Sequence, residues 1–308
     1  MIETEQLTKK YGDLVAIQNL SFKVEEGRIW GLLGPNAAGK TTTMRILTGY
    51  LPATSGKASV AGFDVFEQAE AVKQSIGYLP ETVPLYPEMT VESYLGFVAE
   101  VKKVPTARKK AAVDRAVQIA GLQTVRKRLI RNISRGYKQR TGIAQALIHN
   151  PRVVILDEPT IGLDPAQIKE IRDLIKSLKG EHTIMLSTHI LAEVKEVCDG
   201  VVIINEGKLM ASGSLEELAR SFSQNDGVYL KLDRIDGEVL NLFQQLPGLQ
   251  QASLEGAEIR LEWPWGQDLR TQVLKLCLDK KLEIKEMRSL AMNIEELYLR
   301  IVSGGMEQ

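Results

Sequence analysis

A glycine-bounded loop directly follows an apolar segment near the N-terminus. The apolar residues are 29–33, and the loop reads Gly-Pro-Asn-Ala-Ala-Gly-Lys-Thr-Thr. This order predicts a strand, a phosphate-binding turn and the start of a helix. Backbone N–H groups of such a loop point at a polyphosphate, while Lys40 neutralises the outer phosphates and the Thr41 hydroxyl is a ligand for Mg²⁺. We therefore expect a nucleoside triphosphate site. Its expected contacts are Gly34, Pro35, Asn36, Ala37, Ala38, Gly39, Lys40, Thr41 and Thr42.

The composition limits the class of protein. The chain has 308 residues, of which 44% are hydrophobic and 25% charged, and this length favours about two domains with buried cores. No apolar run approaches the ~18 residues needed to cross a bilayer, and residues 1–5 do not resemble a signal peptide. We therefore expect a cytoplasmic protein. Its two cysteines, Cys198 and Cys277, have no metal-ligand spacing and are too few for a disulfide framework.

Positive charge is concentrated in one segment, although the formal net charge of the chain is zero. Residues 101–140 contain thirteen Lys or Arg against the single acid Asp114. Such a block is a solvated helix face, a contact for anionic lipid or a nucleic-acid surface. Because Tyr137 is the only aromatic residue in it, we rank nucleic acid last and keep the first two interpretations as equals.

Short apolar segments rich in β-branched residues predict the strands of a first domain. They are residues 15–24, 28–33, 153–156, 183–187 and 201–205. Helical patterns separate the last three, as a buried parallel sheet requires. Between them lies a predicted helical subdomain, in which Thr90 can cap one helix and Gly121 follows the end of another. We place this subdomain at about 88–150 and the first domain at 1–222.

A second pattern begins at residue 226. Its predicted order is strand, helix, strand, strand, helix and strand. The strands are 228–232, 250–254, 258–263 and 282–287, the helices are 238–246 and 268–279, and a final helix starts at Asn293. This order matches a split βαβ sandwich of ferredoxin-like type. The segment has no glycine loop, no His and no convincing carboxylate pair, so we expect residues 226–308 to form an accessory or dimerisation αβ domain.

Two acids end one of the predicted core strands. Asp157 and Glu158 directly follow the apolar residues 153–156, and ligands of open α/β folds sit at this edge of the sheet. Asp157 can hold Mg²⁺ through its water shell. Glu158 can deprotonate the water that attacks the γ-phosphate, a role that contributes about 10²- to 10⁴-fold. A strand end with two acids is often simply solvated, but the phosphate loop favours the catalytic interpretation.

Two polar residues elsewhere are further candidates. His189 follows the predicted strand 183–187, where a neutral imidazole can bond a γ-phosphate oxygen or the attacking water, although a lone His more often satisfies a local hydrogen bond. Ser134 precedes a helical stretch from Lys138 to His149, so it is a natural N-cap at an anion-binding helix end.

Together these residues resemble the ATP-binding cassette ATPases, the nucleotide-binding subunits of ABC transporters. The resemblance covers about residues 2–220 and contains the family's elements in order. They are Gly34 to Thr42 as the Walker A loop, Ser134 to Tyr137 as the signature, Asp157 and Glu158 as the Walker B pair, and His189 as the switch histidine. It implies an α/β P-loop NTPase with a RecA-like core, an antiparallel β layer and a helical subdomain.

The resemblance assigns further residues and cofactors. Tyr11 stands where the family has an aromatic residue that stacks on adenine, Glu81 at the Q-loop glutamine, and Asp164 in the D-loop. It implies ATP and Mg²⁺ as cofactors, with Thr41, Glu81 and Asp157 as metal ligands. It also implies a head-to-tail dimer, in which Ser134 and Gly136 of one copy close over the ATP on the other.

Four positions depart from the family pattern. Ala37 replaces a glycine of the phosphate loop, and if that position requires a positive φ the methyl group costs about 1 to 2 kcal/mol. Arg135 and Tyr137 replace the first glycine and the glutamine of the signature, which adds a cation and an aromatic ring near the neighbouring subunit's γ-phosphate. Glu81 replaces the Q-loop glutamine and remains an oxygen ligand for Mg²⁺.

The leading functional hypothesis is an export ATPase. The resemblance implies a subunit on the inner face of the cell membrane that pairs with itself or a paralogue beneath separate permease subunits. Residues 77–81 and 134–140 look like the export branch served by type-2 permeases, especially ATPases associated with gliding motility.

Two alternatives belong to other classes. One is a soluble cassette ATPase acting on ribosomes or DNA, although such relatives usually carry two cassettes or a long coiled coil. The other is a regulator that binds nucleotide without turnover. Lys40, Glu158 and His189 are all present, which argues against a catalytically dead site.

Overall fold

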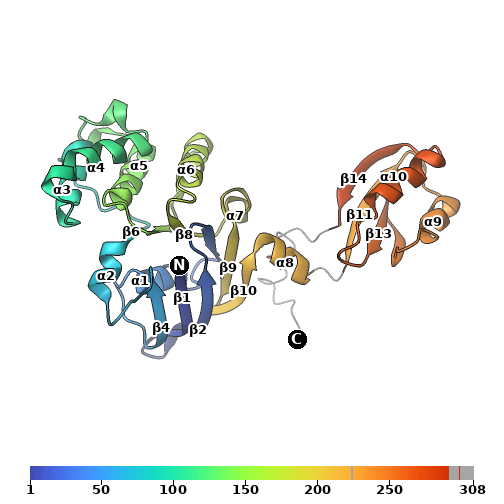
Figure 1. The fold of residues 1–308 in the computed structure, drawn as a ribbon, viewed down its shortest axis with the longest axis horizontal. Coiled ribbons are helices and arrows are strands. Elements are labelled where there is room, and N and C mark those ends of the chain that lie inside the picture. The colour runs from blue at the N-terminus through green and yellow to red at the C-terminus, as the bar shows by residue number, and fades with distance from the viewer. Residues whose placement is uncertain (223–224, 291–297, 299–308) are drawn as a thin grey trace. The chain divides into compact units, whose positions relative to one another are not determined.

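The computed structural model describes residues 1–222, 225–290 and 298 of the chain (Figure 1). It divides into two units, Met1–Ser214 with two sheets and Leu215–Gln308 with one. The predicted domain boundary at 222 to 226 lies after helix α8 (Leu215–Phe222), whereas the division between the units lies before it. Among the residues described, no helix is both long and apolar enough to cross a membrane.

A six-stranded sheet forms the centre of the first unit, in the order β10-β9-β3-β8-β7-β6. Its strands are β3 (Ile29–Leu33), β6 (Ile76–Leu79), β7 (Val153–Asp157), β8 (Thr183–Thr188), β9 (Gly200–Asn205) and β10 (Lys208–Ser214). Five run parallel, and β10 pairs antiparallel at one edge. Every residue of β3, β7 and β8 is buried, which explains their continuous apolar sequences. The predicted parallel sheet is confirmed.

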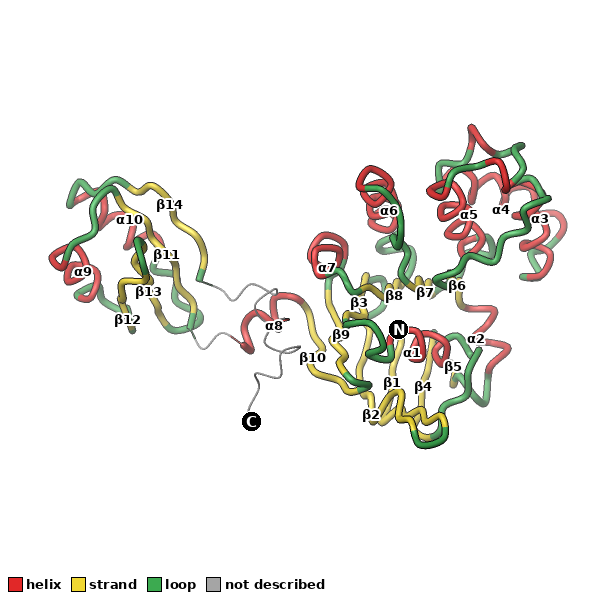
Figure 2. The backbone as a smooth tube through the Cα atoms, turned by 180° about the vertical axis from the view of Figure 1, so that it is seen from behind, coloured by secondary structure: helices red, strands yellow, loops and turns green. Residues whose placement is uncertain are grey.

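An antiparallel sheet forms a second layer, in the order β2-β1-β4-β5. Its strands are β1 (Ile2–Tyr11), β2 (Leu14–Val24), β4 (Ser55–Val60) and β5 (Phe63–Asp64). Helix α1 (Lys40–Leu47) lies between the two sheets, as Figure 2 shows, and its Met44, Ile46 and Leu47 belong to the shared core. Burial of α1 on both sides fixes the helix that begins at the phosphate loop.

Sequence analysis did not assign β1. Its pairing with β2 shifts register after Thr4, after Leu7 and after Lys9, and Gln6 has a φ of 46°. These bulges break the alternation of apolar and polar residues from which a strand is recognised.

Helices α6 (Pro165–Ser177) and α7 (Leu191–Val197) lie on the face of the six-stranded sheet opposite α1 (Figure 2). Each connects two strands of the parallel sheet, α6 from β7 to β8 and α7 from β8 to β9. The chain therefore returns to the same sheet edge after each crossover, which brings the residues following β7 and β8 together.

The region of the predicted helical subdomain, about 88–150, is helical in the structure. It contains α3 (Val91–Val101), α4 (Thr106–Ile119), α5 (Arg135–Leu147) and two short 3₁₀ turns, Gln123–Val125 and Ile130–Asn132, while α2 (Ala69–Ser75) precedes β6. The Thr90 hydroxyl accepts the Ser93 N–H at 3.1 Å, and the Ser134 hydroxyl accepts the Tyr137 N–H at 3.4 Å. Both predicted N-caps are therefore present.

The second unit has an antiparallel sheet in the order β12-β13-β11-β14. The strands are β11 (Asp226–Leu232), β12 (Gln251–Glu255), β13 (Glu258–Trp263) and β14 (Ile284–Ser289), and the helices are α9 (Gly237–Gln244) and α10 (Arg270–Asp279). Phe243 of α9, Cys277 of α10 and Trp263 of β13 share one core, so both helices cover the same face of the sheet. The final helix predicted from Asn293 lies outside the described residues, apart from residue 298.

Candidate active site

A cavity of about 830 Å³ opens at the carboxyl ends of the central strands. Most of the phosphate loop lines it, together with the residues that follow β7 and β8. The predicted residues among its lining are Asn36, Ala37, Gly39, Lys40, Thr41, Thr42, Glu81, Glu158 and His189. Parallel strands that end at one edge thus bring segments far apart in the sequence into one site.

The phosphate loop has the backbone that its sequence predicts. Gly39 has a φ of 102°, and Ala37 has a φ of 63°, so the position where Ala37 replaces a glycine does require the left-handed region. A Cβ atom at Gly34 would lie 2.4 Å from the carbonyl oxygen of Ile204, so no larger residue fits there. Ala37 therefore carries a strain of about 1 to 2 kcal/mol that a glycine would avoid.

The Lys40 ammonium is held inside this loop. It donates to the carbonyl oxygens of Gly34 at 2.8 Å and Pro35 at 3.1 Å, and it lies 3.4 Å from Glu158 Oε1. The Lys40 and Glu158 side chains are only 7% and 8% exposed, so this is a buried ion pair. A buried ammonium at the mouth of a phosphate-binding turn is placed to receive further negative charge.

His189 contacts the same carboxylate. Its Nδ1 atom lies 3.0 Å from Glu158 Oε2 and 3.2 Å from Oε1. An ionised carboxylate only accepts hydrogen bonds, so Nδ1 carries the hydrogen and donates a hydrogen bond to Glu158. In the neutral ring the Nε2 atom is then an acceptor, suited to a water molecule, whereas donation to a phosphate requires the imidazolium.

Asp157 has one oxygen engaged and one without a partner. Its Oδ1 atom accepts a hydrogen bond from Ser187 Oγ at 2.6 Å and lies 3.5 Å from Thr41 Oγ1. Its Oδ2 atom is buried and has no hydrogen-bond partner. A buried unpartnered carboxylate oxygen beside a threonine hydroxyl fits a Mg²⁺ ion, which takes one or two protein oxygens plus substrate phosphates.

The described residues contain no group of three His, Cys, Asp or Glu side chains that could hold a metal by themselves. The donors that fit Mg²⁺ are therefore Thr41 and Asp157, completed by phosphate oxygens, with Glu81 at the rim of the same cavity.

Tyr11 does not join the cavity. The residue is 46% exposed, and Lys9 Nζ lies 5.2 Å from the centroid of its ring. The cavity is lined near this point by Leu14, Val15 and Ala16, which the sequence analysis did not single out. The stacking of adenine on Tyr11 remains a prediction.

The signature residues and Asp164 do not line this cavity either. Ser134 caps α5, and Asp164 caps α6 by accepting the Gln167 N–H at 3.0 Å. Arg135, which replaces the first glycine of the signature, donates to the Ile161 carbonyl at 2.9 Å, within the loop that follows Glu158. Arg135 therefore contacts its own chain.

Ser187 is the main site residue that sequence reasoning missed. Its hydroxyl donates to Asp157 and accepts the Glu158 N–H at 2.9 Å. It lies opposite Asp157 in the parallel register of β7 and β8. The register of β7 against β8 cannot be predicted from the sequence. The only sequence signal for Ser187 was its position directly before Thr188 and His189.

Replacing Lys40 with alanine should weaken nucleotide binding by about 10- to 100-fold, because a hydrogen bond to a charged group contributes about 1.5 to 3 kcal/mol. Titration with a fluorescent ATP analogue measures this loss. The exposed Lys57→Ala on β4 is the matched control, and equal affinities for the two variants would remove Lys40 from the phosphate site.

Comparisons with family models and with known proteins agree on one family. A family model described as "ABC transporter" matches residues 17–161. The bacitracin transport ATP-binding protein BcrA of Bacillus licheniformis is 35% identical over 99% of this chain and 98% of its own length. The linearmycin resistance ATP-binding protein LnrL of Bacillus subtilis is 28% identical over 98% of each chain.

A solved structure described as an ATP-binding subunit of an ABC transporter superposes with a TM-score of 0.66 at 30% identity, covering 72% of this chain and 93% of that one. The cavity, with the phosphate loop and Lys40 in its lining, fits the nucleotide that such a subunit binds. The chain therefore belongs to the ATP-binding proteins of ABC transporters and is an ABC-type ATPase.

Proposed function

We propose that this chain is the motor subunit of an exporter, which dimerises head to tail and drives separate membrane permeases. One observation supports the dimer. In the family, two sets of residues contact the same nucleotide, but in this chain only one of the two sets lines the cavity. Lys40, Glu158 and His189 line one cavity, while Ser134 and Gly136 do not. A second copy would supply them, and a C₂ dimer then forms two equivalent sites.

Within each site, the described contacts support a division of roles. Lys40 and the loop N–H groups would bind the phosphates, and Thr41 and Asp157 would hold a Mg²⁺ ion, which would supply neutralisation of the phosphate charge. Glu158 is the base for the attacking water, and His189 holds the Glu158 carboxylate through Nδ1. Lys40 Nζ pairs with Glu158 here, so bound phosphates compete with Glu158 for the ammonium and release the carboxylate for the water.

The relatives support export. The curated names describe bacitracin transport in one relative and linearmycin resistance in another. We assign this chain to the same kind of exporter, working at the inner face of the cell membrane, with cargo recognition left to the permeases. Its placement in the gliding-motility-associated branch rests on the sequence resemblance alone and stays a prediction.

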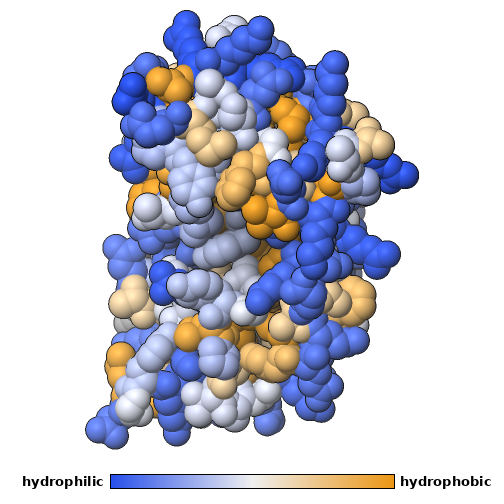
Figure 3. All heavy atoms as spheres, turned by 90° about the vertical axis from the view of Figure 1, so that its left-hand side faces the viewer, coloured by the Kyte–Doolittle hydropathy of each residue, from blue (hydrophilic) through white to orange (hydrophobic). Residues whose placement is uncertain are grey.

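One face of the helical subdomain supports permease docking. Figure 3 shows this side of the molecule, where apolar side chains lie among charged ones. On and next to α3, Tyr86, Phe97 and Val101 are 52%, 41% and 61% exposed, and the Tyr86 and Phe97 rings meet edge to face at 5.6 Å. Exposed aromatic and aliphatic side chains of this kind are typical of protein interfaces.

Five of the thirteen cations of segment 101–140 pair with carboxylates within the chain. The segment's cations that pair with carboxylates are Lys103, Lys109, Arg126, Arg131 and Arg140. A lipid contact along the whole segment is therefore weaker than its formal charge suggests.

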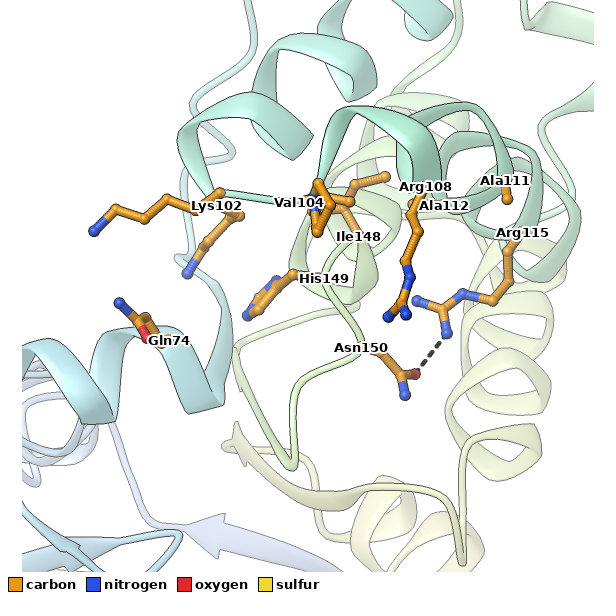
Figure 4. A pocket seen from close by; sticks show the side chains of 12 residues that line it. Gln74, Lys102, Val104, Arg108, Ala111, Ala112, Arg115, Ile148, His149 and Asn150 are labelled. Carbon is orange, nitrogen blue, oxygen red and sulfur yellow. Dashed lines mark hydrogen bonds between the residues drawn. The ribbon is translucent and has the colours of Figure 1, made fainter.

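Three of the remaining cations line a cavity of about 560 Å³ (Figure 4). Lys102, Arg108 and Arg115 line it, with His149, whose pKa is lowered to about 4 by burial and by the neighbouring Lys102. His149 is thus neutral at pH 7. We place the predicted contact with anionic lipid at this cavity.

The second unit has the strand order expected of a ferredoxin-like domain. Its first and third strands, β11 and β13, are neighbours at the centre, and β12 and β14 lie at the edges. We propose that it is such a domain and acts as an accessory to the cassette.

Replacing Glu158 with glutamine should abolish turnover while ATP binding persists, because the amide keeps the shape of the side chain but cannot take a proton. The variant should accumulate as an ATP-bound dimer, which light scattering with and without Mg-ATP detects. Turnover near the wild-type rate would exclude Glu158 as the base.

Copurification from mildly solubilised native membranes tests the transporter assignment. One or two polytopic permeases should be recovered with the wild-type chain, identified by mass spectrometry. Recovery of ribosomal or DNA-associated proteins alone would overturn this assignment in favour of a soluble cassette ATPase.

A further inference from the structure

We propose that Glu193 is a positioning residue for ATP hydrolysis, which clamps the loop carrying Glu158 to the loop carrying His189. Glu193 lies on α7 and is only 2% exposed. One of its carboxylate oxygens accepts a hydrogen bond from the Thr160 hydroxyl, and the other accepts one from the Thr188 hydroxyl at 2.6 Å. A single buried carboxylate thus bonds to both loops.

The two threonines stand next to the reacting groups. Thr160 follows Glu158 by two residues, and Thr188 immediately precedes His189. Both are buried, at 5% and 0% exposure, so their hydroxyls have no access to bulk water as an alternative partner. Glu193 therefore sets the spacing of the two loops at the point where Glu158 and His189 meet.

The orientation of the clamp is itself fixed. The Thr188 hydroxyl accepts the Ile190 N–H at 3.0 Å, so its proton is free to point at Glu193. On the other side of Glu193, Arg172 Nη2 of α6 lies 3.6 Å from Oε1 and compensates the buried charge. Hydroxyl donors and a guanidinium together satisfy a carboxylate that would otherwise be costly to bury.

The pairing of β7 with β8 cannot supply this restraint alone. Ser187 ties the strands together at Asp157 and Glu158, but Thr160 and His189 lie beyond the last paired residues of the two strands. Without Glu193 the loops are free to separate, and a displacement of about 1 Å in a reacting group costs roughly 100-fold in rate. Glu193 does not line the nucleotide cavity, so its effect on hydrolysis is transmitted through the positions of Glu158 and His189.

The chain offers a matched control on the same helix. Glu196 also pairs with Arg172, but it contacts neither threonine in the described structure and is 40% exposed. Glu196→Gln removes a negative charge from α7 and an ion-pair partner from Arg172, and it leaves the hydrogen bonds of Glu193 to Thr160 and Thr188 in place. It separates loss of the clamp from loss of a helix charge.

Steady-state ATPase measurements on the full chain test the proposal, which rests on the roles given to Glu158 and His189. Glu193→Ala should lower kcat by about 10- to 100-fold with KM for ATP changed less than about threefold. Glu193→Gln, which keeps the shape and one acceptor, should recover part of the rate, and Glu196→Gln should match the wild type.

Thr160→Val and Thr188→Val keep the volume of the side chain and provide the test if Glu193→Ala does not fold. Each should lower kcat, and the double variant should lose less than the product of the two, because both act through one carboxylate. Wild-type kcat in both folded single variants, or equal losses in kcat and in ATP affinity, would overturn the proposal.

A second readout does not depend on turnover. The chain has only three histidines, His149, His182 and His189, so the imidazole NMR signals can be assigned by substitution. The chemical shifts of the His189 imidazole should change in Glu193→Ala and stay unchanged in Glu196→Gln. An unchanged His189 signal in folded Glu193→Ala would refute the proposed clamp. This result does not depend on whether Glu158 is the base.

Discussion

The hydrogen bonds of one buried serine hold the acidic side of the site together. Ser187 Oγ donates to Asp157 and accepts the Glu158 N–H, so one hydroxyl links the last residue of β7 and the first residue beyond it to β8. This geometry exists because β7 and β8 run parallel with Asp157 opposite Ser187. The Asp157 carboxylate is thereby turned toward Thr41 with its second oxygen unpartnered, ready for a metal ion. Sheet register, rather than any local sequence pattern, places Asp157 and Glu158, the proposed metal ligand and the proposed base, beside the phosphate loop.

The charges of the site depend on this arrangement. A glutamate that is 93% buried is held by the Lys40 ammonium and by His189 Nδ1, and Lys40 is also held by two loop carbonyls. In the proposed mechanism, bound phosphates would take the place of Glu158 at the ammonium, and the carboxylate would keep His189 as its partner. Nucleotide binding and activation of the proposed base would then be coupled through Lys40.

The sequence predicted the parts of the site that depend on local order. The phosphate loop, the acids after 153–156 and the capping residues Thr90 and Ser134 follow from short-range patterns, and the structure confirms their elements. Long-range contacts could not be predicted. Ser187 and Glu193 act across strands and helices, Arg135 bonds to Ile161 within its own chain, and β1 is hidden by bulges. The Tyr11 ring has Lys9 as its neighbour and does not line the cavity, because its position depends on the path of the β1–β2 turn.

Complementation between two inactive variants tests the central claim, that each site combines the phosphate loop of one copy with the signature of another. Lys40→Ala disables the first, and Ser134→Asp keeps a helix-capping oxygen while placing a negative charge toward the phosphates. A mixed dimer of the two retains one intact site, so an equal mixture should regain roughly a quarter of wild-type ATPase activity although each variant alone is inactive. A mixture as inactive as its components would contradict the shared site.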